Sequence, residues 1–208
     1  MIRKSVRATV ILAALLLTPL ALAATTGIGE QAKMVVQQSF RAKGQAGMDR
    51  LVQDDVQRIC SRTPKQAPLS AKEIERLMRS QEAAIRYPAD GNYVGDWREG
   101  EKIAQSGIGM QFSDDPTKPA GGNCYACHQL SKTEISYGTI GPSLYQYRAL
   151  RGDDPDLARR TYAKIYNPQA FLPCSKMPRF GHKGILTEAQ IKDVVALLLA
   201  PASPVNQE

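Results

Sequence analysis

Histidine and cysteine are scarce in this sequence, because its 208 residues include only two histidines and four cysteines. Any transition-metal site must therefore draw on a small set of side chains. Long hydrophobic runs are missing after residue 23, so no later stretch predicts a membrane-spanning helix. The sequence also lacks an arginine-rich run and any nucleic-acid-binding motif, which excludes nucleic acid as a partner.

The one long hydrophobic run lies at the N-terminus and has the order of a secretory signal. Three basic residues come first, an apolar stretch follows, and Ala21-Leu22-Ala23 is a small-x-small cleavage site. An uncleaved membrane anchor is the alternative, but the run is short for a full span and contains Pro19 near its end. We expect residues 1–23 to be removed, so that a periplasmic protein without a membrane span begins at Ala24.

The charge of the mature chain is modest. Residues 1–23 hold three of the 27 basic residues and none of the 20 acidic ones, so the remaining 185 residues carry a net charge of +4. This charge suits an acidic protein partner or an anionic substrate, and it equally suits simple solubility. A chain of this length is enough for one small domain and an additional segment.

A cluster of chemistry-bearing residues lies at Cys124, Cys127 and His128, in the pattern Cys-x-x-Cys-His. This pattern is the attachment signature of haem c, in which both thiols form thioethers and the histidine becomes an axial iron ligand. A thioredoxin-like redox pair would need a βαβ unit, for which the sequence has no pattern. A zinc site would use Cys124 and Cys127 and would need two more ligands, for which only Cys60, Cys174, His128 and His182 remain. We therefore predict one covalently bound haem c per chain.

Helical patterns precede and follow this motif. Asp96 predicts the start of one helix and Gly107 its end. Gly100 within that helix costs about 1 kcal/mol against alanine, which another helix approaching closely would explain. The expected partner is a C-terminal helix that begins with a capping box of Thr187 and Gln190.

An N-terminal helix that crosses a C-terminal helix, with the haem motif just after the first, is the plan of class I c-type cytochromes. We therefore predict an all-α fold with a class I cytochrome c domain over residues 92–208. Within it, a further helix is expected to begin at Asp154-Pro155 and to run to Tyr166, because Asn167-Pro168 stops it.

Residues 24–91 are predicted to form a helical extension. Apolar residues recur with helical spacing over residues 48–59 and again over residues 74–85. The second of these segments follows a capping box of Ser70 and Glu73. An extension of this size is marginal as an independent fold. We therefore expect it to pack on the haem domain, on a partner subunit, or on both.

The second axial ligand of the iron is reached by elimination. After His128, Met177 is the only methionine and His182 is the only other histidine. Met177 lies in a proline-rich segment that Gly181 closes and that precedes the C-terminal helix. We expect Met177 to be the second ligand, which favours ferrous iron and raises the reduction potential, with His182 as the alternative.

Cys60 and Cys174 are the two cysteines outside the haem motif. In an exported protein, such a pair is interpreted first as a disulfide. The bridge would fasten the extension beside Met177, whereas two unpaired thiols are the alternative.

A family resemblance extends beyond the haem motif. Gly138 to Leu144 resembles the Gly-Pro-x-Leu segment of class I cytochromes, which implies that the Pro142 carbonyl accepts the Nδ1–H of His128. Five segments together resemble the SoxX family over about residues 92–206. They are Gly122 to His128, Gly138 to Leu144, Tyr166-Asn167-Pro168, Met177-Pro178-Arg179-Phe180-Gly181 and Ser203-Pro204-Val205-Asn206. Members of this family are the monohaem subunits of the SoxAX cytochrome complexes of bacterial thiosulfate oxidation.

This resemblance implies a part in an L-cysteine S-thiosulfotransferase. SoxAX couples thiosulfate oxidatively to a cysteine of the SoxYZ carrier protein, and two electrons leave to an acceptor cytochrome c. The catalytic cysteine belongs to the SoxA-type partner of the heterodimer, so the resemblance gives this chain an electron-relay role and no catalytic residue. A free periplasmic class I cytochrome c that only shuttles electrons is the alternative.

Overall fold

The computed structural model describes residues 27–62, 68–152 and 154–207, and the predicted signal segment with its cleavage site lies outside them. Helices and loops make up this part of the chain, together with one isolated β-bridge between Lys43 and Ala46. The described residues contain no strand, which confirms the all-α fold class. None of the described helices is both long and apolar enough to span a bilayer.

The chain divides into two units, residues 1–40 and residues 41–208. The first unit contains the helix α1 (Ile28–Ser39). The second unit contains the helices α2 (Asp55–Cys60), α3 (Ala71–Ala83), α4 (Trp97–Gln105), α5 (Tyr147–Arg151), α6 (Leu157–Tyr166) and α7 (Glu188–Leu199). It also contains the 3₁₀ turns η1 (Met48–Leu51), η2 (Cys124–Ala126) and η3 (Pro168–Ala170).

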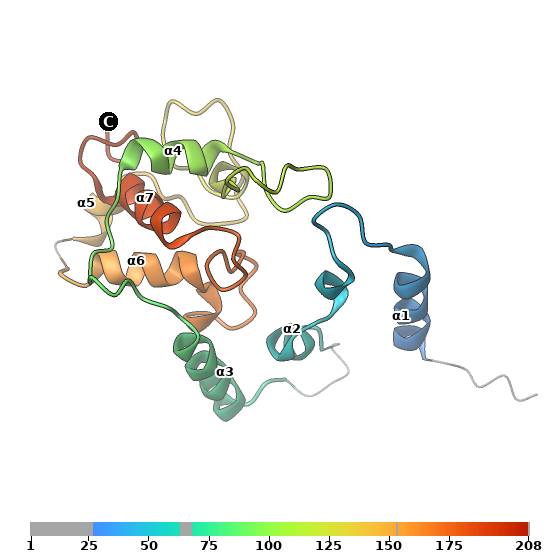
Figure 1. The fold of residues 1–208 in the computed structure, drawn as a ribbon. Coiled ribbons are helices and arrows are strands. Elements are labelled where there is room, and N and C mark those ends of the chain that lie inside the picture. The colour runs from blue at the N-terminus through green and yellow to red at the C-terminus, as the bar shows by residue number, and fades with distance from the viewer. Residues whose placement is uncertain (1–26, 63–67, 153, 208) are drawn as a thin grey trace, which may run out of the picture. The chain divides into compact units, whose positions relative to one another are not determined.

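Helices α4 and α7 cross in close contact in the second unit (Figure 1). A Cβ atom added to Gly100 would lie 2.1 Å from the carbonyl oxygen of Asp193 and 3.0 Å from Cβ of Leu197. Only glycine allows this approach, because ordinary carbon contacts need about 3.5–4.0 Å. The interpretation of Gly100 as the mark of a helix crossing is therefore confirmed.

Two predicted helix starts carry complete capping boxes. Ser70 accepts from the N–H of Glu73 at the start of α3, and the Glu73 side chain accepts from the N–H of Ser70. Thr187 and Gln190 make the same reciprocal pair at the start of α7. Each box satisfies backbone donors that have no partner within the helix, which explains why these local patterns predicted the boundaries correctly.

The start of α6 differs from the prediction, whereas its end does not. The helix begins at Leu157, with Asp156 as its N-cap, because Asp154 accepts from the N–H of Asp156 and pairs with Arg160 instead of capping the helix. The helix ends at Tyr166, directly before Asn167-Pro168.

The segment 48–59 is not one helix. Asp54 interrupts it by capping α2, in a capping box with Gln57, so that a 3₁₀ turn and a short helix replace the continuous helix predicted from apolar spacing. The apolar residues before the break are exposed, and Val56 is the buried residue of α2. The Asp-x-x-Gln pattern is the local signal that would have predicted this start.

The core lies between α4, α6 and α7 (Figure 1). Tyr162 is fully buried at its centre, and its ring lies 5.6–6.3 Å from the rings of Tyr87, Tyr93 and Tyr166. The hydroxyl of Tyr162 donates to the carbonyl oxygen of Arg86 at 3.2 Å. These contacts join the segment after α3 to α6, and α3 itself packs against η3.

Candidate haem site

The haem attachment motif forms one compact turn. Asn123 adopts a left-handed conformation with φ 46°, and η2 follows it directly. The N–H groups of Cys127 and His128 both donate to the carbonyl oxygen of Cys124, at 3.1 and 2.9 Å. The turn therefore holds the backbone of the motif in one compact shape, and neither thiol is in a disulfide.

The ring of His128 is held on two sides. Its Nδ1 lies 2.7 Å from the carbonyl oxygen of Pro142, to which the neutral ring donates its Nδ1–H. A Cβ added to Gly141 would lie only 2.1 Å from the Cε1 atom of the ring, so the backbone of residue 141 contacts the imidazole directly. This arrangement fixes the ring and leaves Nε2 as the nitrogen available to a metal. It is the contact expected for Pro142; the ligand role of His128 itself stays a prediction.

Backbone hydrogen bonds attach the motif to the segment that follows it. Three of them, 2.7–2.8 Å long, run from Gly138 to Tyr125, from Gly141 to Cys127 and from Leu144 to Gln129. A Cβ added to Gly138 would lie 1.9 Å from the carbonyl oxygen of Ala126. Both glycines of this segment are therefore required by close packing on the haem motif, a reason that the sequence pattern did not reveal.

Met177 lies in the loop of residues 172–181, which we call the Met177 loop. The N–H groups of Gly181 and His182 donate to the carbonyl oxygen of Tyr166 at 3.2 and 3.1 Å, and Gly181 packs against the Tyr166 ring. Met177 is half-buried against the core. The loop is thus closed onto the end of α6.

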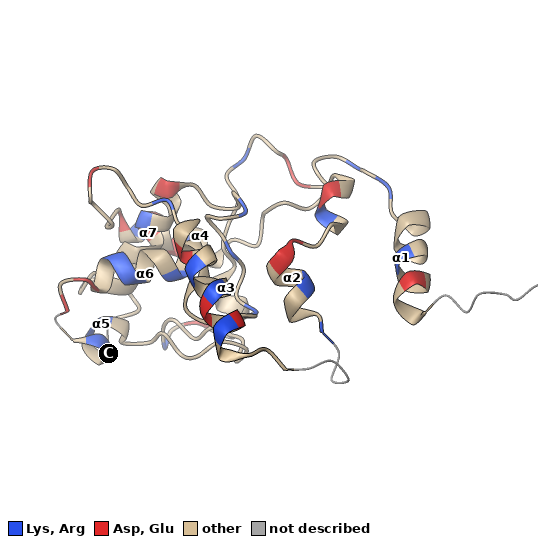
Figure 2. Ribbon diagram, turned by 90° about the horizontal axis from the view of Figure 1, so that it is seen from below, with Lys and Arg blue, Asp and Glu red and all other residues tan. Residues whose placement is uncertain are grey.

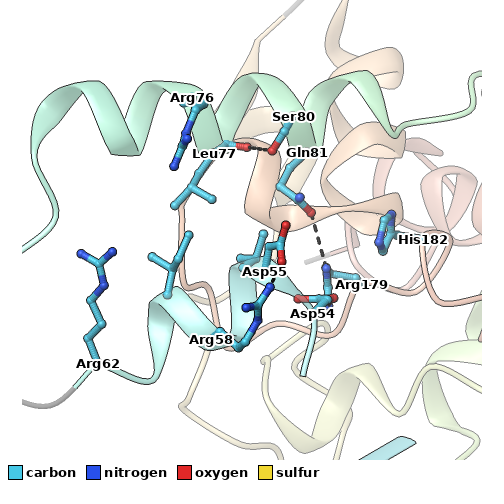
Figure 3. A pocket seen from close by; sticks show the side chains of 12 residues that line it. Asp54, Asp55, Arg58, Arg62, Arg76, Leu77, Ser80, Gln81, Arg179 and His182 are labelled. Atoms are coloured by element: carbon cyan, nitrogen blue, oxygen red, sulfur yellow. Dashed lines mark hydrogen bonds and ion pairs between the residues drawn. The ribbon is translucent and has the colours of Figure 1, made fainter. Parts of the chain in front are cut away.

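The alternative ligand, His182, lies in a different environment. Its side chain lines a cavity beside α2 and α3, near Arg179 (Figure 3). Burial lowers the pKa of His182, and the charges of Arg179 and Lys183 lower it further. His182 therefore lines this cavity, whereas Met177 packs against the core.

The predicted disulfide is confirmed, because Cys60 and Cys174 are bonded with a Cα–Cα distance of 5.4 Å. The bridge joins the last residue of α2 to the Met177 loop, across 114 residues of sequence.

A polar network continues from the other end of α2. Asp54 accepts from Arg179 at 2.5 Å and from Lys183 at 3.1 Å, and the Arg179 side chain is buried. Burial alone would raise the pKa of Asp54. The N–H of Gln57 and the two cationic side chains outweigh that effect, so the pKa of Asp54 is lowered. Nothing in the sequence indicated this pairing, because the partners are 125 residues apart.

The structure argues against the other interpretations of the cysteine motif. Burial raises the pKa of the Cys124 thiol to about 12, whereas a redox-active cysteine pair needs a lowered pKa. No group of three or more His, Cys, Asp or Glu side chains in the described part of the chain could hold a metal ion, which excludes the zinc site there.

The residues present do fit haem c. Two unpaired thiols, an imidazole with Nε2 available and a half-buried thioether are the donors that thioether attachment and Met/His ligation need. Accessible apolar side chains in the adjoining segments, Ile140 and Leu172, suit an apolar macrocycle.

Comparison with known proteins identifies a cytochrome c domain in this part of the chain. The cytochrome c family model matches residues 99–200. An "Uncharacterized lipoprotein" of Aquifex aeolicus (strain VF5) is 42% identical over 158 residues, which cover 74% of this chain and 73% of the relative. A match of that length must include residues before residue 92, so the relative shares part of the extension as well. The chain therefore belongs to the family of this Aquifex protein, and its cytochrome c domain is an all-α class I cytochrome, an electron-transfer module that carries covalently bound haem c.

Proposed function

We propose that this protein is the monohaem cytochrome subunit of a SoxAX-type L-cysteine S-thiosulfotransferase in the periplasm. In that reaction the terminal sulfur of thiosulfate forms a bond with the thiol sulfur of a carrier-protein cysteine. The thiol proton is lost and two electrons leave, which must be passed on one at a time. The catalytic cysteine lies on a SoxA-type partner subunit, and this chain relays the electrons to an acceptor cytochrome c.

Four residues would hold the cofactor. Cys124 and Cys127 provide the thioether links, His128 and Met177 the axial ligands. The bound haem supplies a one-electron redox centre. The Pro142 carbonyl holds the Nδ1 proton of His128, which orients the ring and raises its basicity as a ligand. A thioether ligand favours ferrous iron, which suits a subunit that accepts electrons.

One observation supports the complex over a free shuttle. The chain continues before the cytochrome c domain into α2 and α3, and α2 is bonded covalently to the Met177 loop. A freely diffusing carrier has no evident use for this addition, whereas a subunit can present it to a partner.

Export is supported by the signal pattern of residues 1–23, and the name of the Aquifex relative describes that protein as a lipoprotein.

Co-purification and carrier conjugation test the proposal. The protein is expressed with its signal in a host that attaches haem c, together with the other haem proteins of its source organism. We expect it to co-purify with one of them. The pair should add thiosulfate to a carrier cysteine, measured as the mass gain of the carrier, and neither chain alone should do so. A monomer that only exchanges electrons with other cytochromes would establish the shuttle instead.

A further inference from the structure

Both ends of α2 are attached to the Met177 loop. At its C-terminal end, Cys60 is disulfide-bonded to Cys174, three residues before Met177. At its N-terminal end, the N-cap Asp54 is paired with Arg179, two residues after Met177. The two attachments therefore lie on either side of Met177 in the sequence, and both come from one helix of six residues.

Packing holds α2 through one buried side chain, that of Val56. A cavity of about 990 Å³ lies beside α2 and α3, lined on the α2 side by Val56 and Ile59 and on the α3 side by Leu77 and Ser80. Figure 3 shows the two helices on opposite sides of this cavity. Basic and acidic residues both occur along each helix (Figure 2), and Arg58 pairs with Asp55 within α2. The disulfide and the Asp54–Arg179 pair therefore link the two ends of α2 to the Met177 loop.

Arg179 is also held from the side opposite Asp54. Its Nη1 donates to Oε1 of Gln81, on α3, at 3.4 Å, and Figure 3 shows Gln81 pointing across to it. Gln81 in turn accepts from Nδ2 of Asn167 through its side chain and its carbonyl oxygen, each at 3.1 Å. The buried guanidinium thus connects the Met177 loop to α2, to α3 and to the end of α6.

We propose that α2 is a positioning brace for Met177, in which the Asp54–Arg179 pair and the Cys60–Cys174 bridge fix the loop that presents the thioether. A constrained loop keeps Met177 close to its coordinating position whenever the sulfur dissociates, so an external ligand competes poorly. Asp54 and Arg179 are positioning residues here, because they act through the loop. The inference rests on the proposed role of Met177 as an iron ligand.

Neighbouring aspartates provide a matched test on the haem-loaded protein. Asp54→Asn keeps a good N-cap residue but removes the charge that faces Arg179. Asp55→Asn removes the ion pair with Arg58, which stays within α2. The readouts are the weak red absorption band of thioether–ferric ligation and the affinity of the ferric protein for imidazole. We expect Asp54→Asn to bind imidazole about tenfold more tightly, because losing the charge that faces the buried Arg179 loosens the loop, and Asp55→Asn to behave as the wild type.

A second variant keeps the test decisive if Asp54→Asn does not fold. Cys60→Ser with Cys174→Ser removes the covalent attachment without leaving an unpaired thiol, and the same gain in imidazole affinity is expected. If neither altered attachment changes the affinity relative to Asp55→Asn, the brace is refuted. If the wild type lacks the thioether band, or Met177→Ala retains it, the proposed ligation fails first, independently of the brace.

Discussion

The close approach of Gly141 to His128 leads to a quantitative prediction for Gly141→Ala. The added methyl group would lie 2.1 Å from Cε1 and 2.4 Å from Nδ1 of the ring, so the imidazole must move by about 1.5 Å to restore an ordinary contact. That movement breaks the 2.7 Å hydrogen bond to Pro142. Overpacking costs about 1–3 kcal/mol and the lost hydrogen bond about 1 kcal/mol. Reduced freedom of the unfolded chain returns about 0.4–1 kcal/mol.

The net loss for Gly141→Ala is about 1–3.6 kcal/mol, which lowers the melting temperature of the haem-loaded protein by about 2–14 °C. We also expect its reduction potential to rise, because His128 without the Pro142 bond is a weaker donor to the iron. Calorimetry and a spectroscopic redox titration measure the two effects. Gly109→Ala is the control, since nothing lies within 4 Å of its added Cβ. Equal melting temperatures and potentials in the two variants would refute the argument for a glycine at residue 141.

Three further variants test the α4–α7 crossing and the two attachments of α2. Gly100→Ala should lower the melting temperature, because overpacking of about 1–3 kcal/mol exceeds the helix-propensity gain of about 1 kcal/mol, whereas Gly29→Ala in α1, with open space around it, should not. Replacing Cys60 and Cys174 by serine should reduce the free energy of unfolding in urea by about 4 kcal/mol, since the bridge closes a long loop; an unchanged urea midpoint would contradict this. Because the pKa of Asp54 is lowered in the folded state, its stabilisation is complete above the unfolded value of about 3.9 and is lost as the pH falls below it. The stability difference between the wild type and Asp54→Asn should therefore be largest near pH 7 and should shrink below pH of about 4; a difference that stayed constant would exclude a charge effect.

Features that depend on neighbouring residues were predicted correctly. The capping boxes of α3 and α7 need only a side chain and a backbone N–H three residues apart, so the sequence contains the whole interaction. The same holds for the end of α6 at Asn167-Pro168, where proline has no N–H to donate. Gly100 was interpretable because a glycine inside a helix is unfavourable unless packing requires it.

The predicted helix boundaries were wrong at two places where two local patterns competed. Apolar spacing over residues 48–59 predicted one helix, but the capping box at Asp54 ends that helical phase and starts α2. At α6, Asp154 is of a residue type that is common at N-caps, yet its carboxylate pairs with Arg160 and the helix begins later. In both cases hydrogen bonds formed by an aspartate decided which of the competing starts is used.

By itself, the amino-acid sequence determined the haem chemistry, because the thiols and the imidazole that act together are within five consecutive residues. It also determined the all-α class, through periodicity and capping. The one remaining pair of cysteines predicted a disulfide, which the structure confirmed. Only the tertiary structure decided that Gly141 lies against the His128 ring and that Asp54 meets Arg179. The members of each pair are not neighbours in sequence. A charged group or a glycine carries no local signal for its partner, so the pairing is decided only when the folded chain brings the two residues into contact.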